Sequence, residues 1–377
     1  MQTTIKTEAN QTEKILATVE SYLQEIVAPS AAEIDKNSEI LRQMLLGMGE
    51  RSLLALKVPQ NFGGAGFKAI DYHRFQMLMA RYSGALTFLQ TQHQSAGSML
   101  AASNNQELKQ RYLPHMSTGK ILVGVGFSQL RRPGEPMMKA EQVEGGYLLS
   151  GNVPWITGFG FFNNFIVGAT LADGREIYGL LPLEEKNTKG LIKFSPPMEL
   201  IAMNSTNTVS AEIQKWFLEN DRVVAIKPSG SIHENSKKNI LHHGFYALGC
   251  AQAGLDIIQN MYRKKQLLFL QETYESLQQE LDDCRQEMLS AVCVSSSEAI
   301  ERDIYEKKLQ LRALAINLAG RCSQAAVIAS SGAANDRDHP AGRVYREALL
   351  FSVSGQTTAV MEESLRTAKR IPAGSLY

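Results

Sequence analysis

Cysteine is scarce in this sequence, and its spacing excludes two kinds of site. The 377 residues include four cysteines, all in helix-like sequence and none in a CxxC or Cys/His arrangement: Cys250, Cys284, Cys293 and Cys322. Zinc sites and disulfide frameworks need ligands or partners at close, regular spacing. We therefore expect buried free thiols and no metal site.

Long apolar runs and an excess of one charge are also missing. Apolar stretches such as Asn164 to Leu171 are soon interrupted by charge, well short of the roughly 20 residues that span a bilayer. The 39 basic and 38 acidic residues give a formal net charge of +1, which favours neither nucleic acid nor a membrane as partner. The first fourteen residues are polar and lack the apolar segment of a signal peptide. We expect a cytoplasmic protein with a small-molecule ligand.

Two common catalytic signatures are absent as well. The segment Gly63-Gly64-Ala65-Gly66 has neither the preceding strand nor the following Gly-Lys-Ser/Thr that a phosphate-binding loop requires. We interpret it as a turn. The sequence has no Gly-x-Ser-x-Gly motif, so serine hydrolase chemistry has no support.

The hydrophobic pattern changes twice along the chain. Residues 1–122 have the three- and four-residue spacing of amphipathic helices, and this helical period returns over residues 231–377. Residues 123–230 contain short β-type runs bounded by turn residues, with Ala172-Asp173-Gly174 as a hairpin loop between two of them. The expected fold class is α+β and multidomain, with a helical N-terminal domain, a β-rich middle domain and a C-terminal helical bundle.

Three places carry side chains suited to ligand chemistry. Trp155-Ile156-Thr157 lies in a glycine-rich neighbourhood and offers a stacking face and a hydroxyl, although a tryptophan there is also common in a core. His93 is flanked by polar residues on an apolar helix, as a site histidine or a hydrogen-bonded structural histidine would be. His242 and His243 are adjacent near the start of a helix, so only one of them can face a given site.

Four segments, in order and at matching spacing, resemble those of acyl-CoA dehydrogenases over about residues 13 to 370. They are Val58–Gly66 (VPQNFGGAG), Glu107–Lys120 (ELKQRYLP, then GK), Gly145–Thr157 (GGYLLSG, then WIT) and Arg343–Ala348 (RVYREA). The resemblance implies a helical N-terminal domain, a β-barrel-like middle domain, a C-terminal four-helix bundle and a homotetramer or homodimer. It also implies FAD bound between the middle domain and the bundle.

The resemblance assigns part of the flavin site. Trp155 matches the family position beside the isoalloxazine, Thr157 matches the residue that hydrogen-bonds flavin N5, and Ile156 lies between them. The Thr-Glu-Pro segment that holds the pyrimidine end of the flavin corresponds to Ser128-Gln129-Leu130. A hydroxyl is kept there and the carboxylate is lost.

The chain departs from the family at the catalytic base. Dehydrogenation needs a carboxylate to take the α-proton while the flavin accepts a hydride. The family places this glutamate nine residues after the Arg346 position, and here that position is Gly355; the alternative position is Asn239. Neither residue is a base at neutral pH. His242 and His243 lie three and four residues after Asn239, so one of them, with His243 the candidate catalytic residue, is a possible substitute on the same helix face.

Fewer residues of the family's flavin diphosphate site are also kept in this sequence. The family's Arg-x-x-Phe-Gly keeps only its phenylalanine, Phe269, and its Gln-x-x-Gly-Gly-x-Gly keeps Gly332. Losing a cationic phosphate contact weakens FAD binding, or FMN replaces FAD. Residues 263–265 (Arg-Lys-Lys) either compensate for this loss or form a solvated helix face.

Three functions agree with this pattern. The first is a flavin-dependent oxidoreductase that acts by hydride transfer on an acyl thioester, such as an acyl-CoA, or a related small substrate. The second is a flavin-dependent monooxygenase of the same superfamily, which removes no α-proton and often uses a histidine near the position of His93. The third is a non-catalytic flavin-binding descendant. An electron-transfer or flavin-reductase partner is expected for the first two.

Overall fold

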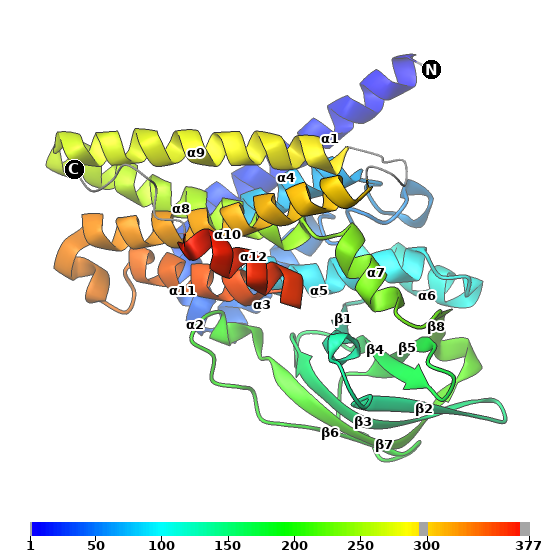
Figure 1. The fold of residues 1–377 in the computed structure, drawn as a ribbon. Helices are drawn as coiled ribbons and strands as arrows, with labels where there is room; N and C mark the ends of the chain where they lie inside the picture. The colour runs from blue at the N-terminus through cyan, green and yellow to red at the C-terminus, as the bar shows by residue number, and fades with distance from the viewer. Residues whose placement is uncertain (1, 294–300, 370–377) are drawn as a thin grey trace. The chain divides into compact units, whose positions relative to one another are not determined.

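The computed structural model describes residues 2–293 and 301–369, which form two compact units. Unit 1 comprises Met1–Thr18, Lys36–Lys68 and Phe88–Ser236, and unit 2 comprises Val19–Asp35, Ala69–Thr87 and Lys237–Tyr377. Figure 1 shows helices at both ends of the chain and strands in its middle. The predicted fold class, α+β with N-terminal helices, a central sheet and C-terminal helices, is confirmed. The division into three domains at residues 122/123 and 230/231 stays a prediction.

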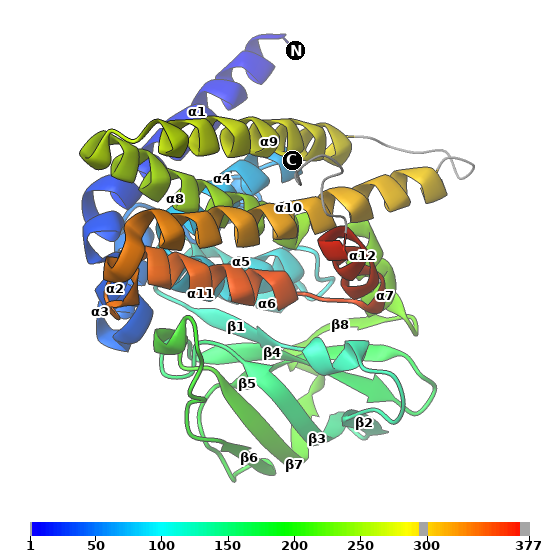
Figure 2. The ribbon, with the colours of Figure 1, turned by 60° about the vertical axis from the view of Figure 1, so that its left-hand side comes forward.

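Unit 1 is built on one eight-stranded sheet. Its main path runs β6-β7-β3-β2-β4-β5-β8, and β1 pairs in parallel with β4. Figure 2 shows β3, β7 and β6 side by side at one end of this sheet. The strands are β1 Val123–Gly126, β2 Met138–Val143, β3 Gly146–Ile156, β4 Asn164–Leu171, β5 Glu176–Pro182, β6 Leu191–Phe194, β7 Val209–Glu219 and β8 Val223–Lys227.

The sheet curls so strongly that its own strands form the two sides of a core. The predicted hairpin is present: β4 and β5 pair antiparallel from Thr170 and Glu176 outward, with Gly174 at φ +83° in the turn. Although β5 and β7 are not neighbours in the sheet, a Cβ at Gly179 would overlap the side chain of Leu218. Gly179 therefore lets the two strands approach face to face, which is the curvature of a barrel-like sheet.

The helices of unit 1 cover one end of this core. α3 (Ser38–Glu50) begins at Asn37, whose side chain accepts hydrogen bonds from two backbone N–H groups of the first turn. The predicted turn at residues 63–66 is confirmed: Gly63 has φ +80°, and a Cβ at Gly64 would overlap the Val58 carbonyl. The other helices are α1 (Gln2–Tyr22), α5 (Gly84–Ala101), α6 (Gln106–Met116) and α7 (Ser231–Lys238), of which α1, α5 and α7 extend into unit 2.

Unit 2 is a helical bundle around α8 (His242–Lys265). α8 contacts four other helices, and a Cβ at Gly254 would lie 2.7 Å from the Cys322 carbonyl oxygen, so this glycine permits the close approach of α8 and α10. Figures 1 and 2 both show α8 to α11 side by side. The helices are α2 (Ala31–Lys36), α4 (Ala69–Tyr82), α8, α9 (Leu268–Val292), α10 (Glu301–Ser330), α11 (Pro340–Val353) and α12 (Thr358–Lys369).

The segment Arg343–Ala348 holds unit 2 together from α11. Arg343 Nη1 donates to Glu347 Oε1 at 2.7 Å, and the same oxygen accepts from the Gly84 backbone N–H at 3.1 Å. Arg346 forms an ion pair with Asp35 at 3.0 Å. The Arg343–Glu347 pair is almost fully buried, so each charge depends on the other for compensation.

The thiols differ in exposure. Cys250, Cys284 and Cys322 are buried and free, as predicted, but Cys293 is exposed. The prediction was wrong for Cys293 because this residue caps the C-terminus of α9, beyond the packed part of the helix. In the described ranges, no helix has both the length and the apolar character needed to cross a membrane.

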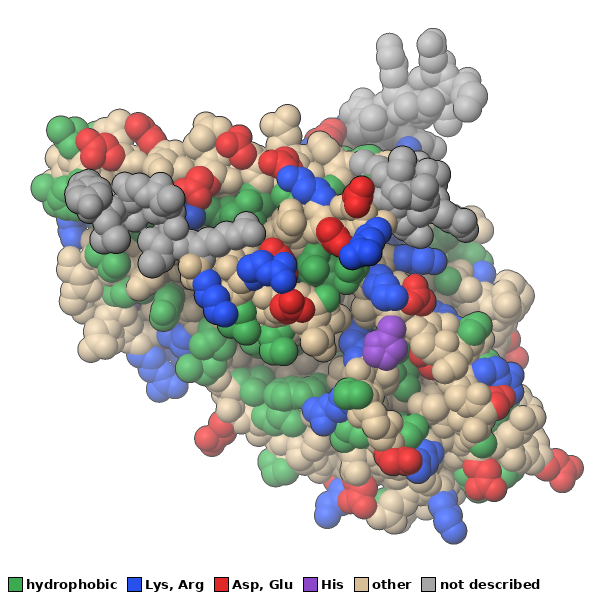
Figure 3. Space-filling model, in the orientation of Figure 1, with side chains coloured by type: hydrophobic (Ala, Val, Ile, Leu, Met, Phe, Trp, Pro, Cys, Tyr) green, Lys and Arg blue, Asp and Glu red, His purple; other side chains and the backbone are tan. Residues whose placement is uncertain are grey.

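An exposed apolar stripe follows α11 and α12. Its members have exposed fractions of 44–59%: Tyr345, Leu349, Val353, Met361 and Leu365. The first three are four residues apart on α11, and the last two are four apart on α12. In Figure 3, hydrophobic side chains lie between charged ones on the face that carries these helices.

Candidate functional site

The end of β3 in unit 1 presents the predicted Trp-Ile-Thr segment. Side chains alternate along a strand, so Trp155 is 48% exposed while Ile156 is fully buried. Thr157, directly after the strand, is 5% exposed. A large exposed indole beside a nearly buried hydroxyl offers one stacking surface and one hydrogen-bonding group to a planar ligand.

The Thr157 hydroxyl ends a chain of three threonines. Its Oγ1 lies 3.0 Å from Thr208 Oγ1, which lies 3.3 Å from Thr206 Oγ1. Thr206 in turn donates to the Met203 carbonyl oxygen at 2.8 Å. The three hydroxyls are thus linked to the backbone of one loop.

Ser128 and Gln129 lie in a 3-10 turn after β1, also in unit 1. Gln129 Nε2 donates to the Gly126 and Gly168 carbonyls, at 3.2 and 2.8 Å. Ser128 Oγ and Gln129 Oε1 are buried and have no hydrogen-bond partner in the part of the chain that the structure describes. A buried polar atom without a partner costs roughly 1–3 kcal/mol, so two together favour a ligand that would satisfy them.

His93 lies on α5 within the core of unit 1. Its ring is 0% exposed; Nδ1 lies 3.0 Å from the Val123 backbone nitrogen and 3.3 Å from its carbonyl oxygen, and Nε2 lies 3.1 Å from the Met116 carbonyl oxygen. Burial lowers the pKa of His93 to about 4, against the opposing effect of these backbone hydrogen bonds. This arrangement favours the structural alternative for His93.

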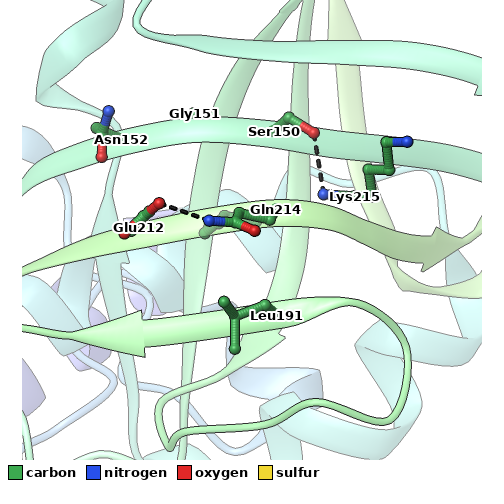
Figure 4. A pocket seen from close by; sticks show the side chains of 8 residues that line it. Ser150, Gly151, Asn152, Leu191, Glu212, Gln214 and Lys215 are labelled. Atoms are coloured by element: carbon green, nitrogen blue, oxygen red, sulfur yellow. Dashed lines mark hydrogen bonds between the residues drawn. The ribbon is translucent and has the colours of Figure 1, made fainter.

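A separate pocket of about 480 Å³ opens on β3, β6 and β7 (Figure 4). Two hydrogen bonds lie along its lining: Gln214 donates to Glu212 at 2.6 Å, and Ser150 Oγ accepts from the Lys215 N–H at 3.0 Å. None of the predicted site residues lines this pocket.

In unit 2 the structure brings together two of the predicted residues, His243 and Gly355. A Cβ built on Gly355 would meet the His243 ring, with Cδ2 at 2.5 Å, Cε1 at 3.0 Å and Nε2 closest of all. The ring thus occupies the place where any side chain at position 355 would begin. Ser354 Oγ lies 2.8 Å from His243 Nδ1 and fixes the ring orientation.

Arg312, on α10, holds the two backbone segments of this cluster. Arg312 is 2% exposed, and its guanidinium donates to the Ile240 carbonyl at 3.0 Å, just before α8. It also donates to the carbonyls of Ser354 and Gly355 at 2.8 and 3.0 Å. One buried side chain therefore sets the separation between the start of α8 and the loop after α11.

His242 faces a different group of rings. Its Nε2 lies 2.7 Å from the Tyr246 hydroxyl, and its ring stacks on Tyr72 with centroids 5.9 Å apart. The ring of Tyr246 contacts both histidines, with centroids 5.2 Å from that of His242 and 5.4 Å from that of His243. Asn239, the other family position for a base, is exposed and precedes α8.

The two residues predicted to bind the flavin diphosphate lie at helix ends of unit 2. Phe269 is 59% exposed in the first turn of α9, and Gly332 is exposed in the turn after α10. Lys265 Nζ donates to the Ala329 carbonyl at 2.7 Å and lies 3.3 Å from Ser331 Oγ. A cation thus lies beside the Gly332 segment, and Arg263, Lys264 and Lys265 are all exposed.

Sequence reasoning missed Ser354, Arg312 and Thr208 as candidate site residues. Arg312 interrupts an apolar stretch of α10, and a lone charge in such a stretch was a usable signal. Ser354 and Thr208 gave no signal, because short hydroxyl side chains are common next to turns. Within residues 2–293 and 301–369 no group of His, Cys, Asp and Glu could hold a metal ion.

Sequence comparisons agree on one family. Residues 9–120 match the acyl-CoA dehydrogenase N-terminal domain. The chain is 24% identical to the probable acyl-CoA dehydrogenase YngJ of Bacillus subtilis over 365 residues, which cover 91% of this chain and 93% of the relative. It is 25% identical to a mitochondrial isovaleryl-CoA dehydrogenase of Solanum tuberosum over 363 residues, covering 91% and 86%. A further acyl-CoA dehydrogenase of B. subtilis is 28% identical over 201 residues, about half of either chain (51% and 52%).

Solved structures share the fold. Butyryl-CoA dehydrogenase of Megasphaera elsdenii has a TM-score of 0.76 at 15% identity and covers 96% of this chain and 98% of its own. KijD3, solved in complex with FMN and a dTDP-linked amino sugar, has a TM-score of 0.75 at 15% identity, covering 95% and 93%. The family model, the sequence relatives and the solved structures all indicate the acyl-CoA dehydrogenase superfamily.

Proposed function

We propose that this protein is a flavin-dependent oxidoreductase in which His243, oriented by Ser354, replaces the usual carboxylate base. The observation that carries the proposal is the position of the His243 ring, which fills the space of a side chain at position 355. The proposed substrate is an acyl thioester or a related small molecule, as the names of the relatives indicate.

The residues of unit 1 fit a flavin. Trp155 supplies an exposed aromatic face, and Ser128 Oγ and Gln129 Oε1 are buried polar atoms that a heterocycle with N–H and carbonyl groups would satisfy. Thr157 supplies a hydroxyl next to the indole. We assign flavin binding to these four residues and to Ile156, whose buried side chain anchors the segment.

In unit 2, Phe269 and Gly332 are assigned to the distal part of the cofactor, and Lys265 is the cation available beside Gly332. FAD needs such a diphosphate contact, whereas FMN has a single phosphate. One lysine in place of a dedicated arginine supports either cofactor.

A bound flavin would accept a hydride from the substrate; the protein must remove the accompanying proton. Imidazole is a base at neutral pH, and its ring position is fixed through Nδ1 by Ser354. Because Nε2 is the ring atom closest to position 355, it is the atom that takes the α-proton. Arg312 fixes the backbone on both sides of this pair and serves as a positioning residue.

A monooxygenase is the second candidate, favoured by the same observation. With the His243 ring in that space, position 355 has no room for a carboxylate, and a monooxygenase removes no α-proton. The fold is shared with KijD3, which was solved with FMN. An electron-transfer partner for the first reaction, or a flavin reductase for the second, completes either cycle.

The test starts from the visible absorbance of the purified protein after incubation with FAD or FMN. Anaerobic butyryl-CoA should bleach the bound flavin, and His243→Gln should slow the bleaching by roughly 100-fold or more, the usual contribution of a general base. The control is His233→Gln, which changes an exposed histidine on α7.

Bleaching at an unchanged rate in His243→Gln would remove His243 from the reaction. No bleaching by acyl-CoA, with oxygen consumption when a reductase supplies reduced flavin, would select the monooxygenase. A protein that binds neither FAD nor FMN would overturn both candidates.

A further inference from the structure

One ordering of the protons satisfies all the hydrogen-bond contacts of the three threonine hydroxyls next to Trp155 at once. Each hydroxyl has a single hydrogen to donate. Thr206 donates to the Met203 carbonyl, which cannot donate in return. The contact between Thr206 and Thr208 therefore requires Thr208 to donate, and the contact between Thr208 and Thr157 requires Thr157 to donate.

The loop that carries Thr206 and Thr208 is held in an uncommon conformation. Met203 and Asn207, at the two ends of the Asn204–Thr206 turn, have φ values of +57° and +46°. Residues other than glycine adopt this left-handed region at a cost, and such strain is concentrated at functional sites. The turn is tied to the Thr157 segment, because Gly158 N–H donates to the Thr206 carbonyl at 2.9 Å.

The two ends of this chain of threonine hydroxyls have different surroundings. Thr206 and Thr208 are 1% and 2% exposed, whereas Thr157 is 5% exposed and follows the half-exposed Trp155. With its hydrogen given to Thr208, Thr157 keeps only oxygen lone pairs for a ligand. The Thr157 end of this threonine chain is thus a hydrogen-bond acceptor.

We infer that Thr157 presents an acceptor to the flavin and so favours its reduced form. This inference rests on the proposed flavin site. Flavin N5 carries a hydrogen when the ring is reduced and only a lone pair when it is oxidised. An acceptor at this position favours the reduced form, whereas a donor would favour the oxidised form. Thr206 and Thr208 thus adjust the redox balance of a cofactor that they do not touch.

Thr208→Val tests the inference, because it leaves Thr157 free to turn its hydrogen toward the ligand. The measurement is the dissociation constant of FMN or FAD in the oxidised and the reduced state, by anaerobic titration. The ratio of the oxidised to the reduced constant should fall about tenfold, which lowers the two-electron reduction potential of the bound flavin by about 30 mV. Thr208→Ser keeps the hydroxyl and should retain the wild-type ratio.

Thr206→Val provides a second route to the same result. Without Thr206 as acceptor, the Thr208 hydrogen becomes available to Thr157, so the ratio should change in the same direction. Flavin binding with an equal ratio in wild type, Thr208→Val and Thr206→Val would overturn the inference while leaving the flavin site intact. Absence of flavin binding to the wild-type protein would instead overturn the proposed function, and the inference with it.

Discussion

Replacing Gly355 with alanine places a methyl group where the His243 ring already lies. The nearest atoms to this methyl group all belong to that ring, with Cδ2 at 2.5 Å and Cε1 at 3.0 Å. Gly355 also has φ +56°, which an alanine adopts only with strain. The substitution therefore adds two separate penalties at one residue.

The two penalties have different magnitudes and different partners. The left-handed conformation costs an L-residue roughly 1–2 kcal/mol, and overpacking a filled site costs roughly 1–3 kcal/mol. We expect Gly355→Ala to lower the free energy of unfolding by roughly 2–5 kcal/mol, their sum. Only the overpacking part depends on His243. In Gly355→Ala with His243→Ala, that part should disappear and leave the conformational part.

The assay is urea unfolding followed by far-UV circular dichroism for the wild type, both single variants and the double variant. The double-mutant cycle should give a coupling free energy of roughly 1–3 kcal/mol, with the double variant more stable than the sum of the single effects predicts. Gly320→Ala on α10 is the control, since a Cβ there meets no atom within 4 Å. A coupling energy near zero would refute the placement of the His243 ring over position 355.

Three further predictions concern stability and assembly. The pKa of His93 is lowered to about 4 in the folded state, against about 6.5 in the unfolded chain. The stability contributed by the neutral His93 ring is therefore complete above pH 6.5 and is lost as the pH falls toward 4. Between pH 7 and pH 5, the free energy of unfolding of His93→Gln should fall by about 2 kcal/mol less than that of the wild type, as measured by urea unfolding. Arg343→Met removes the cation that pairs with the buried Glu347 and should lower the free energy of unfolding by roughly 3–5 kcal/mol. The control is Arg302→Met, at an exposed residue, which should change the free energy of unfolding by less than about 0.5 kcal/mol in the same assay. Leu349→Glu, in the exposed stripe of α11, should shift the protein to a smaller species in sedimentation velocity; an unchanged species would exclude the stripe as a self-association surface.

Local patterns predicted the secondary structure because the physical causes are local. The loop Ala172-Asp173-Gly174 predicted a hairpin, and Thr170 pairs with Glu176 on either side of it. The glycines of residues 63–66 predicted a turn, and Gly63 has the left-handed conformation that such turns require. In both cases the determining residues are neighbours in the chain.

The candidate site could be predicted only in part because its contacts are distant in sequence. His243 and Ser354 are 111 residues apart, and no periodicity links them. The sequence identified His243 as a possible base and Gly355 as the position of the missing one, but as separate statements. In the three-dimensional structure, the His243 ring occupies the space in which a side chain at position 355 would lie.

Different physical constraints act on two groups of residues: those in the segments that resemble the family, and those at the position of the catalytic base. Gly64 is needed because any side chain there would overlap the Val58 carbonyl, and Arg343 with Glu347 forms a buried ion pair; both determine the fold. The base position is constrained in another way, by its own left-handed φ of +56° and by the His243 ring. A glutamate at position 355 would need the space that the His243 ring now fills, so Gly355→Glu alone should fail to restore a carboxylate base. The two residues therefore have to change together, and the fold can persist while the proton acceptor differs.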